Sequence, residues 1–493
     1  MKFIGKIPTT ILVLPFALLI LAVFIFIALN KLSPAGPTCD KCNVVLISID
    51  TLSALHLPCY GYDRNTAPNL CKFADENINF LNSYSQSPST INSHFSIFTS
   101  LYPHTHKMIG ITGASLNENY LTLAQLYKMN NYKTFYYGPL DSPHLPLNRG
   151  VERGFDFINK KYSTNNEENW NSVYQTLIDN ASKNQSSFFF LHTHALHNPY
   201  FTGHETTHLF TNLPEYPNIA LTRDEYYSLT PQFLSFVTDQ NFSNQSNSDM
   251  ETLIKIDNYP DKINMVKLKQ AKDQQEKISI FNALSDQIKM YLVMIWNLSR
   301  INQNDPNQIE YLKALYDERI HAMDQNLGKF LKLMTDPKLA KNTIIIITAD
   351  HGEEFMEHGY LHHAHNLFRT STQVPLIMHI PGIPPKKISD LVQGIDIYPT
   401  VISLTNMLPK SPIEGINLTG LIKGEKNAPT NNYIRSEWDD GSVAIQSQNM
   451  RYYYNDNSNS PIGLYNLITD PREKNNLKDS NPEVIREFKV MLK

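Results

Sequence analysis

Two apolar runs that lie far apart in the sequence both lead to side chains that can bind a metal ion. Residues 43–49 are rich in β-branched side chains and are followed by Asp50, and residues 343–348 lead to Asp350 and His351. Such runs are typical of strands buried on both faces of a parallel sheet, and the carboxyl ends of such strands meet at one edge. We therefore expect these three side chains to meet at one divalent cation.

A threonine between the two runs is the predicted nucleophile. Thr90 lies in a hydroxyl-rich segment, residues 87–94. With the two aspartates and His351 it completes a set of oxygen and nitrogen ligands, which suits Zn²⁺ or Mn²⁺ better than Ca²⁺. A bound divalent ion lowers the pKa of a hydroxyl, and the resulting alkoxide can attack phosphorus or sulfur. The competing interpretation is that each aspartate only caps the helix that follows it.

The composition indicates a large globular protein and argues against one class of partner. The chain has 493 residues and is 41% hydrophobic and 18% charged, which is enough for a large core and too long for one small domain. The formal net charge is -4, so no basic excess favours nucleic acid as a partner. We expect an ester substrate and no nucleic acid.

An apolar segment at the N-terminus has the length of a membrane span. Residues 9–29 carry no charge and are preceded by Lys2 and Lys6. About 20 apolar residues cross a bilayer, and lysines before a span stay in the cytoplasm. We predict an uncleaved transmembrane helix over residues 1–31 in a bacterial inner membrane, with the catalytic part in the periplasm. A cleavable signal peptide is the alternative.

All four cysteines, Cys39, Cys42, Cys59 and Cys71, come soon after this segment. An even number of cysteines outside the cytoplasm permits two disulfides, with three different pairings. Cys39 and Cys42 would also fit half of a zinc or redox motif, but the second pair of ligands that zinc needs is missing.

Predicted strands alternate with predicted helices through most of the chain, which implies a three-layer α/β sandwich. A strand that starts at Ser187 breaks into a loop holding three histidines. The other predicted strands are 43–50, 132–138, 343–348 and 374–380, and the predicted helices are 69–77, 90–101, 121–130, 170–181 and 307–334.

Changes in these patterns divide the chain into parts. The middle of the chain is polar, with weak helical patterns at 263–275 and 278–298, and we interpret it as an insertion or lid. The last part contains short strands and one helix, which is typical of a small antiparallel α+β lobe. The predicted parts are the anchor 1–31, a linker 32–42, a catalytic domain 43–430 with the insertion 201–305, and the C-terminal lobe 431–493.

The motifs along the chain, taken in order, resemble those of the sulfatase branch of the alkaline phosphatase superfamily. The resemblance covers nearly everything from Asn43 to Lys493 except the polar insertion, and it implies an alkaline-phosphatase-like sandwich. Each motif is a modest signal, whereas their order and spacing together are a strong one. The matching segments are Asp50–Leu52, Pro58–Tyr62, Asn65–Asn69, Thr90–Ser100, Gly154–Asp156, His197–Tyr200, Tyr316–Ile320 with Asp324, Thr348–Glu353, Val374–Ile377, Asp396–Thr400, and Leu464–Leu467 with Asp470, Pro471, Asn476 and Leu477.

Three positions depart from the sulfatase signature, which begins with a Cys or Ser that is oxidised to formylglycine. Thr90 takes that first place, Asn92 takes the place of the proline and His94 that of the arginine. A threonine cannot become formylglycine. The predicted ligand set is instead similar to that of the phosphoethanolamine transferases and lipoteichoic acid synthases, which use a threonine nucleophile on phosphodiesters. Those transferases carry a multi-span membrane domain, whereas this sequence has one apolar span.

The resemblance also implies roles for histidines. His197 and His363 match positions that hold the ester oxygens and protonate the leaving group, and His94 would orient Thr90. His106 matches a family position too, with a supporting structural role as the alternative. For each histidine the competing interpretation is an ordinary core or surface residue. A second metal ion is a further hypothesis, with Glu353, His358, His362 and His365 as the ligands.

The sequence therefore predicts a metal-dependent ester hydrolase or phosphotransferase that acts on a phosphate or sulfate ester through Thr90. A lipid head group or a glycan would carry that ester. One alternative is a sulfuric ester hydrolase, a sulfatase proper, that works without formylglycine. An alternative from another class is a catalytically silent, membrane-anchored binding protein that has kept the fold.

Overall fold

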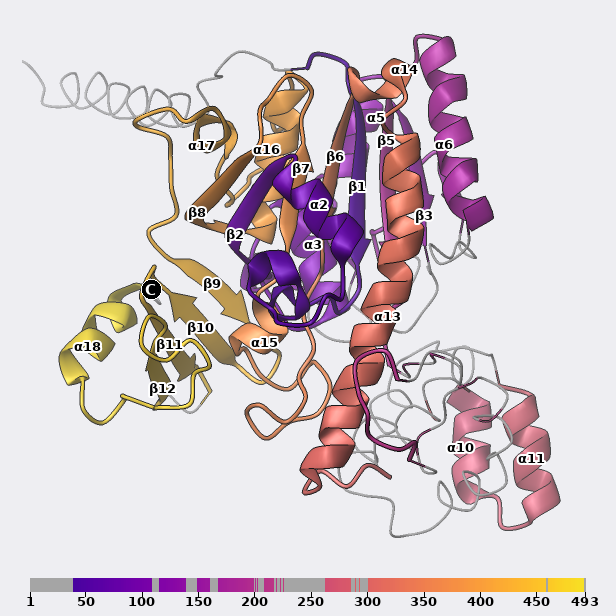
Figure 1. The fold of residues 1–493 in the computed structure, drawn as a ribbon, viewed down its shortest axis with the longest axis vertical. Helices are drawn as coiled ribbons and strands as arrows, with labels where there is room; N and C mark the ends of the chain where they lie inside the picture. Colours follow the sequence, from indigo (N-terminus) through magenta and orange to yellow (C-terminus); the bar gives the residue numbers. More distant parts are fainter. Residues whose placement is uncertain are drawn as a thin grey trace, which may run out of the picture.

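Two β-sheets form the framework of the protein (Figure 1). The computed structural model describes residues 39–108, 115–138, 149–159, 167–198, 208–216, 262–284, 300–457 and 460–491, with a few single positions between 200 and 292. In these residues an eight-stranded sheet has the order β4-β3-β5-β1-β6-β7-β2-β8, and a four-stranded sheet has the order β12-β11-β10-β9. The strands of the large sheet are β1 (Asn43–Ile49), β2 (Ile78–Tyr84), β3 (Lys133–Tyr137), β4 (Phe157–Asn159), β5 (Ser187–Thr193), β6 (Thr343–Thr348), β7 (Leu376–His379) and β8 (Lys386–Gln393).

β1 lies inside the large sheet and is buried on both faces. It pairs in parallel with β5 on one side and with β6 on the other. Val45 and Ile47 pack into the apolar core on one face of the sheet, whereas Val44 and Leu46 pack into the core on the other face. Alternate side chains of a strand point to opposite faces, so a strand between two cores needs the nearly continuous apolar run that this segment has.

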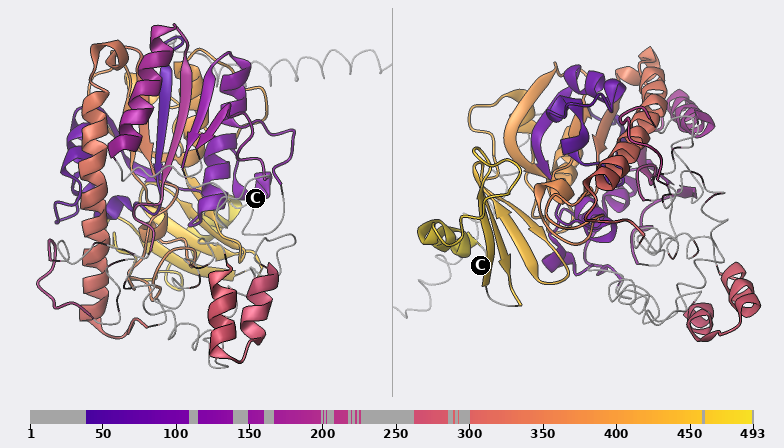
Figure 2. Two further views of the ribbon diagram at one scale, coloured as in Figure 1. Left: turned by 90° about the vertical axis from the view of Figure 1, so that its right-hand side faces the viewer. Right: turned by 60° about the horizontal axis from the view of Figure 1, so that its bottom comes forward.

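Helices cover both faces of the large sheet (Figures 1 and 2). One core contains Leu70 of α2, Trp170 of α6 and Leu315 of α13, and the other contains Phe95 of α3 and Val401 of α16. The predicted α/β fold is thus confirmed. The helices on these faces are α2 (Pro68–Asp75), α3 (Thr90–Thr99), α5 (Leu123–Met129), α6 (Glu167–Ser182), α13 (Pro306–Leu333) and α16 (Ile397–Leu404).

β7 departs from the parallel arrangement of the sheet. It corresponds to the strand predicted over 374–380, and it runs antiparallel to both of its neighbours, β6 and β2. Because β6 and β7 run in opposite directions, the chain between them leaves and re-enters the sheet at the same edge. β2 and β8, at this end of the sheet, are not among the predicted strands, since their sequences mix polar and apolar side chains.

The four-stranded antiparallel sheet forms a small C-terminal lobe (yellow in Figure 1), as predicted. Tyr452 and Phe488 belong to the apolar core between this sheet and α18. The buried Arg451 connects the lobe to the large domain, because its guanidinium donates hydrogen bonds to the Leu367 carbonyl and the Thr372 hydroxyl. The elements of the lobe are β9 (Ile434–Glu437), β10 (Ser442–Gln446), β11 (Met450–Asn455), β12 (Ser460–Asn466) and α18 (Pro482–Met491).

The membrane anchor predicted over residues 1–31 lies outside the described residues. Among the helices that the structure describes, none is both long enough and apolar enough to cross a bilayer. The anchor therefore stays a prediction.

Only part of the predicted insertion is described, and it contains α10 (Lys262–Gln270) and α11 (Gln274–Asn282). The helix predicted over 263–275 ends early. Its last residues belong to α11, because the Asp273 side chain accepts a hydrogen bond from the Glu276 N–H and starts a new helix there.

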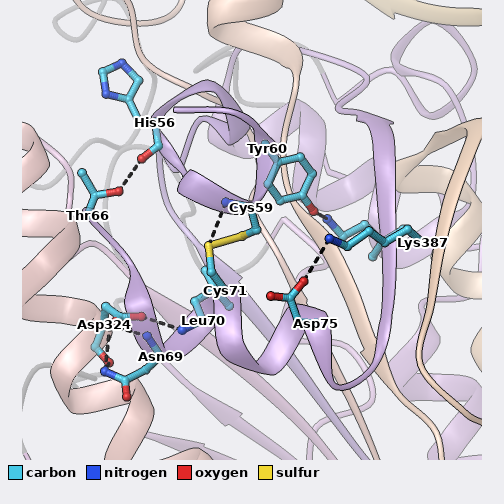
Figure 3. The surroundings of a disulfide bond; sticks show 11 residues. His56, Cys59, Tyr60, Thr66, Asn69, Leu70, Cys71, Asp75, Asp324 and Lys387 are labelled. Carbon is cyan, nitrogen blue, oxygen red and sulfur yellow. Dashed lines mark hydrogen bonds and ion pairs between the residues drawn. A yellow bond between two sulfur atoms is a disulfide. The ribbon is translucent and has the colours of Figure 1, made fainter. Parts of the chain in front are cut away.

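The four cysteines form two disulfides, Cys39–Cys42 and Cys59–Cys71. This is one of the three pairings that the sequence permits. The second disulfide ties the short helical turn Pro58–Tyr60 to α2 (Figure 3).

Asp324 of α13 holds the same segment from another side. Its carboxylate accepts hydrogen bonds from the backbone N–H groups of Asn69 and Leu70, at 3.0 and 2.7 Å (Figure 3). These contacts satisfy the first turn of α2 and dock it on the long helix.

Replacing both Cys59 and Cys71 with alanine should lower the melting temperature of the protein. This disulfide joins positions 12 apart, whereas Cys39–Cys42 joins positions three apart. In the chain-entropy model the longer loop stabilises the fold by about 3 kcal/mol and the shorter one by about 2 kcal/mol. Calorimetry of this variant and of the matched double variant at Cys39 and Cys42 compares the loss of stability in the two proteins. A larger loss of stability in the second variant would contradict the expectation.

Candidate active site

The two aspartates that were predicted as metal ligands lie side by side at the carboxyl edge of the large sheet. Ser48 of β1 is paired with Thr348 of β6, and Asp50 and Asp350 follow these positions by two residues each. Both carboxylates are fully buried. One ligand atom from each aspartate and one from His351 lie within 4.8 Å of one another. The structure thus brings together the side chains at the ends of the two strands.

Thr90 reaches the same point from the start of α3. Its Oγ1 lies 3.2 Å from His351 Nε2. The other ring nitrogen of His351, Nδ1, lies 3.0 Å from the Gly352 carbonyl oxygen and donates its proton there, so Nε2 accepts the Thr90 O–H. The positive N-terminal end of α3 favours negative charge on the Thr90 oxygen.

The donor set fits a divalent cation. Asp50 Oδ1 and Asp350 Oδ2 are buried and have no hydrogen-bond partner among the described residues. Burial and the charge of Asp50 raise the pKa of Asp350, because two carboxylates this close repel each other. A buried carboxylate needs a hydrogen bond, a positive partner or a metal ion. Oxygen and nitrogen donors together suit zinc or manganese.

Two histidines at the end of β5 hold Asp50 from the opposite side. His192 Nε2 and His194 Nε2 lie 3.2 and 3.0 Å from Asp50 Oδ2. Burial opposes the charge of Asp50, yet the charge of His194 and the hydrogen bond from His192 hold the pKa of Asp50 well below its usual value. Against the effect of burial, the charge of Asp50 raises the pKa of His194, whereas burial lowers the pKa of His192 to about 4. The two imidazoles beside Asp50 thus differ, because the pKa of His194 is raised and that of His192 is lowered.

His94 lies beneath Thr90 and connects α3 to β1. Its Nδ1 is 2.9 Å from the Thr90 carbonyl oxygen, and its Nε2 is 3.0 Å from Ser48 Oγ. The ring is fully buried, and burial lowers the pKa of His94 to about 3, so the side chain is neutral at physiological pH. Its contacts suit the predicted role of orienting Thr90, but it lacks the charge of the signature arginine whose place it takes.

His197 and His363, the histidines predicted to act on the ester, have ring centroids 5.0 Å apart. The His363 ring is also 4.4 Å from the ring of His351 and so borders the aspartate pair. His363 Nδ1 lies 3.1 Å from Glu353 Oε1, and His197 Nδ1 lies 2.7 Å from the Asn198 carbonyl oxygen. Both rings are therefore oriented through Nδ1.

Seven of the histidines that the structure describes gather at this edge of the sheet. Successive rings lie in contact, with centroid distances between 3.8 and 5.7 Å. Five of the seven are buried, while His194 and His197 are half-buried, so the group is open to solvent on their side. We call this group the histidine cluster, and its members are His94, His192, His194, His197, His351, His362 and His363.

The residues proposed from the sequence for a second metal do not all meet. Both ring nitrogens of His358 are engaged, Nδ1 by Glu354 and Nε2 by a backbone carbonyl. His365 stacks on the ring of Tyr360 instead. Of the three histidines in that set, only His362 joins the histidine cluster, where it meets two histidines that the sequence had assigned to the ester, and Glu353 contacts one of these, His363.

His106 supports α3 and lies outside the histidine cluster. Its Nε2 is 3.1 Å from Ser96 Oγ, and its Nδ1 accepts a hydrogen bond from the Met108 N–H. These contacts favour the structural role that the sequence left open for it.

His192 and His194 were not among the site residues predicted from the sequence. A signal was present, because alternate residues of a strand share a face and these two are separated by one residue at the end of a buried strand. The position of His362 had no such signal, since it lies in an irregular loop.

Two protein-family models match the chain. The model described as "Sulfatase" matches residues 42–407, and the model described as "N-sulphoglucosamine sulphohydrolase, C-terminal" matches residues 356–493. The first match alone covers most of the chain, and the two together reach from just before β1 to the C-terminus.

Individual relatives are distant, and the share of the chain that they match differs. Arylsulfatase K from Gallus gallus is 26% identical over 239 residues, which are 46% of this chain and 44% of that protein. N-acetylgalactosamine-6-O-sulfatase from Bacteroides thetaiotaomicron is 23% identical over 93% of each chain. The solved phosphonate monoester hydrolase of Agrobacterium radiobacter has a TM-score of 0.64 and 17% identity, over 92% of this chain and 94% of its own. The comparison with the phosphonate monoester hydrolase shows a similar fold.

Metal-free protein should gain thermal stability when Zn²⁺ or Mn²⁺ is added, because the cation binds the folded state. The gain is about 2.7 kcal/mol at one hundred times the dissociation constant. Asp350→Asn should reduce this gain, since one anionic ligand is removed. The amide oxygen can still accept the hydrogen bonds that Asp350 Oδ1 accepts from the Thr51 and His351 N–H groups.

Asp324→Asn is the matched control, because Asp324 is also buried but lies outside the metal group. It should lower the melting temperature and keep the metal-dependent gain. Differential scanning fluorimetry of chelator-treated protein measures both effects. An undiminished gain in Asp350→Asn would show that the cation binds elsewhere.

Proposed function

Because the chain belongs to the sulfatase family, we propose that it hydrolyses a sulfate ester by nucleophilic attack of Thr90. The observation that supports this best is the 3.2 Å contact of Thr90 Oγ1 with His351 Nε2, next to two buried carboxylates. A hydroxyl, two carboxylates and an imidazole in one place are what a metal-dependent ester hydrolase of this kind needs.

The first half of the reaction transfers the sulfo group to the protein. When bound, a divalent cation supplies the charge that lowers the pKa of the Thr90 hydroxyl. The deprotonated Oγ1 attacks sulfur, a bond from Oγ1 to sulfur forms, and the bond from sulfur to the alcohol oxygen of the substrate breaks. The residues that would hold the cation are Asp50, Thr90, Asp350 and His351, and zinc or manganese matches them better than calcium.

Histidines on the open side of the cluster would assist the leaving group. His194 is half-buried and, against the effect of burial, the charge of Asp50 raises its pKa, which makes it the candidate to protonate the departing alcohol oxygen. His197 lies next to His194, and His363 lies next to His197, so these two rings would border the place of the equatorial oxygens of the ester. His94 keeps Oγ1 in place through its hydrogen bond to the Thr90 carbonyl.

The threonine changes the second half of the reaction. A hydrated formylglycine has two hydroxyls and releases sulfate by forming its carbonyl again, whereas Thr90 has one hydroxyl. The sulfo group must therefore leave by attack of water on sulfur, which restores the Thr90 hydroxyl. A covalent sulfo-threonine should accumulate whenever this second attack is the slower one.

A phosphate ester is the second candidate substrate. The observation that favours it is the combination of a threonine with His351 in the ligand set, since phosphothreonine can be cleaved by water at phosphorus in the same site. An acceptor alcohol in place of water would make the enzyme a phosphotransferase.

We propose that a glycan carries the ester. The relative named N-acetylgalactosamine-6-O-sulfatase, which aligns along nearly the whole chain, supports this choice. A lipid head group is the alternative carrier. Two disulfides support a location outside the cytoplasm, where the predicted anchor would hold the enzyme at the membrane.

Thr90→Ala should lower the rate of ester hydrolysis by at least about three orders of magnitude, because the nucleophilic oxygen is gone. Thr90→Ser is the matched control, since it keeps the hydroxyl at the start of α3 and should retain part of the activity. Initial rates with an aryl sulfate and melting temperatures of both variants provide the measurement. Equal rates in the two variants would mean that another group is the nucleophile.

Protein quenched during turnover should carry one sulfo or phosphoryl group on Thr90. Intact-mass analysis and peptide mapping after incubation with matched aryl sulfate, aryl phosphate and bis-aryl phosphate esters detect the group. The substrate with the highest kcat/KM decides between the two candidate ester classes. If the wild-type enzyme hydrolyses the ester but carries no such adduct, even when the reaction is quenched at low pH, water attacks the ester directly.

A further inference from the structure

We propose that His197, His362 and His363 bind a second divalent metal ion, with zinc preferred, beside the aspartate pair. One ring nitrogen of each histidine lies within 4.8 Å of the others. Three imidazoles with an open fourth position are one of the ligand sets of catalytic zinc. The inference deepens the proposed function, because the ion would act on the same ester, but the site itself depends only on the three histidines.

The contacts of two of these histidines are those of metal ligands. His197 Nδ1 lies 2.7 Å from the Asn198 carbonyl oxygen, and His363 Nδ1 lies 3.1 Å from Glu353 Oε1. Histidines that bind a metal through one nitrogen usually donate the other N–H to a carbonyl or a carboxylate, which fixes the tautomer and the orientation of the ring. In this tautomer Nε2 of each ring carries a lone pair.

The backbone brings the third histidine to the same place. His362 and His363 are consecutive residues, yet both contribute to one group of ligand atoms. His362 has a φ of 78°, in the left-handed region, and its N–H donates a 2.9 Å hydrogen bond to the Glu354 carbonyl. Few residues with a side chain adopt this conformation, and here it turns two neighbouring imidazoles toward one point. A bridge between Phe355 and Leu361 closes the loop just before them.

The ion would supply the positive partner that the ester oxygens need. With Nδ1 donating elsewhere, a neutral His197 or His363 ring has no proton on Nε2 to give to an ester oxygen. Three neutral ligands leave the full charge of the ion in place, so its open position attracts a sulfate oxygen. The His363 ring is 4.4 Å from the His351 ring, so the second ion would lie next to the first, as in two-metal hydrolases.

The number of zinc ions bound per chain tests the proposal directly. Chelator-treated protein is reconstituted with Zn²⁺ and desalted, and the metal is then counted by mass spectrometry. We expect two zinc ions per wild-type chain and one in His362→Asn. Asparagine tolerates the left-handed region and removes the imidazole, so this variant preserves the loop better than alanine would.

His358→Asn is the matched control on the same loop. Both ring nitrogens of His358 are engaged, by Glu354 and by the Arg472 carbonyl, so this variant should keep two ions. Cobalt in place of zinc gives an independent reading, because a nitrogen-rich tetrahedral site has visible absorption bands that His362→Asn should lose.

A count of one in the wild type, or a count of two in His362→Asn, overturns the proposal. The wild-type count decides the matter even where the variant does not fold. Failure of the proposed function is a different result, because a protein that cleaves no ester would still bind two ions. A wild-type count of one with turnover that depends on Thr90 would refute the second site alone.

Discussion

Two carboxylates buried side by side are the constraint on which this site depends. The parallel pairing of β1 with β6 places Asp50 and Asp350 at the same level, inside a core that excludes water. Their mutual repulsion is unfavourable unless positive groups surround them. The His194 imidazole, the N-terminal end of α3 and the predicted cation all act on this one concentration of negative charge.

The imidazoles around that charge are held rigidly by their second nitrogens. His351 is oriented by the Gly352 carbonyl, and His363 by the Glu353 carboxyl group. Because backbone carbonyls and buried acids fix the rings, little reorganisation is needed when a ligand arrives, which is the condition for strong electrostatic stabilisation of a transition state. The same arrangement explains why so many histidines fit in one place without mutual repulsion, since most of them are neutral.

The sequence predicted the centre of the fold and of the site because both follow from local patterns. The apolar runs before Asp50 and Asp350 identified two adjacent strands, and the motif order identified the family, which the family model confirmed. Strand direction depends on tertiary packing, so the residues of β7 do not reveal that it runs antiparallel to its neighbours. His362 was placed correctly near the site but with the wrong neighbours, because its position depends on a backbone conformation that no residue pattern reveals.

The antiparallel step from β6 to β7 also bears on how such a protein can diversify. Both ends of the connecting segment are anchored in neighbouring strands, and the segment never passes to the far side of the sheet. Its length and composition can therefore vary without shifting the register of any strand. Asp350 and His351 open this segment, and His362 and His363 lie farther along it. Changes at its remaining positions could therefore alter substrate preference while the nucleophile and the predicted ligands stay in place.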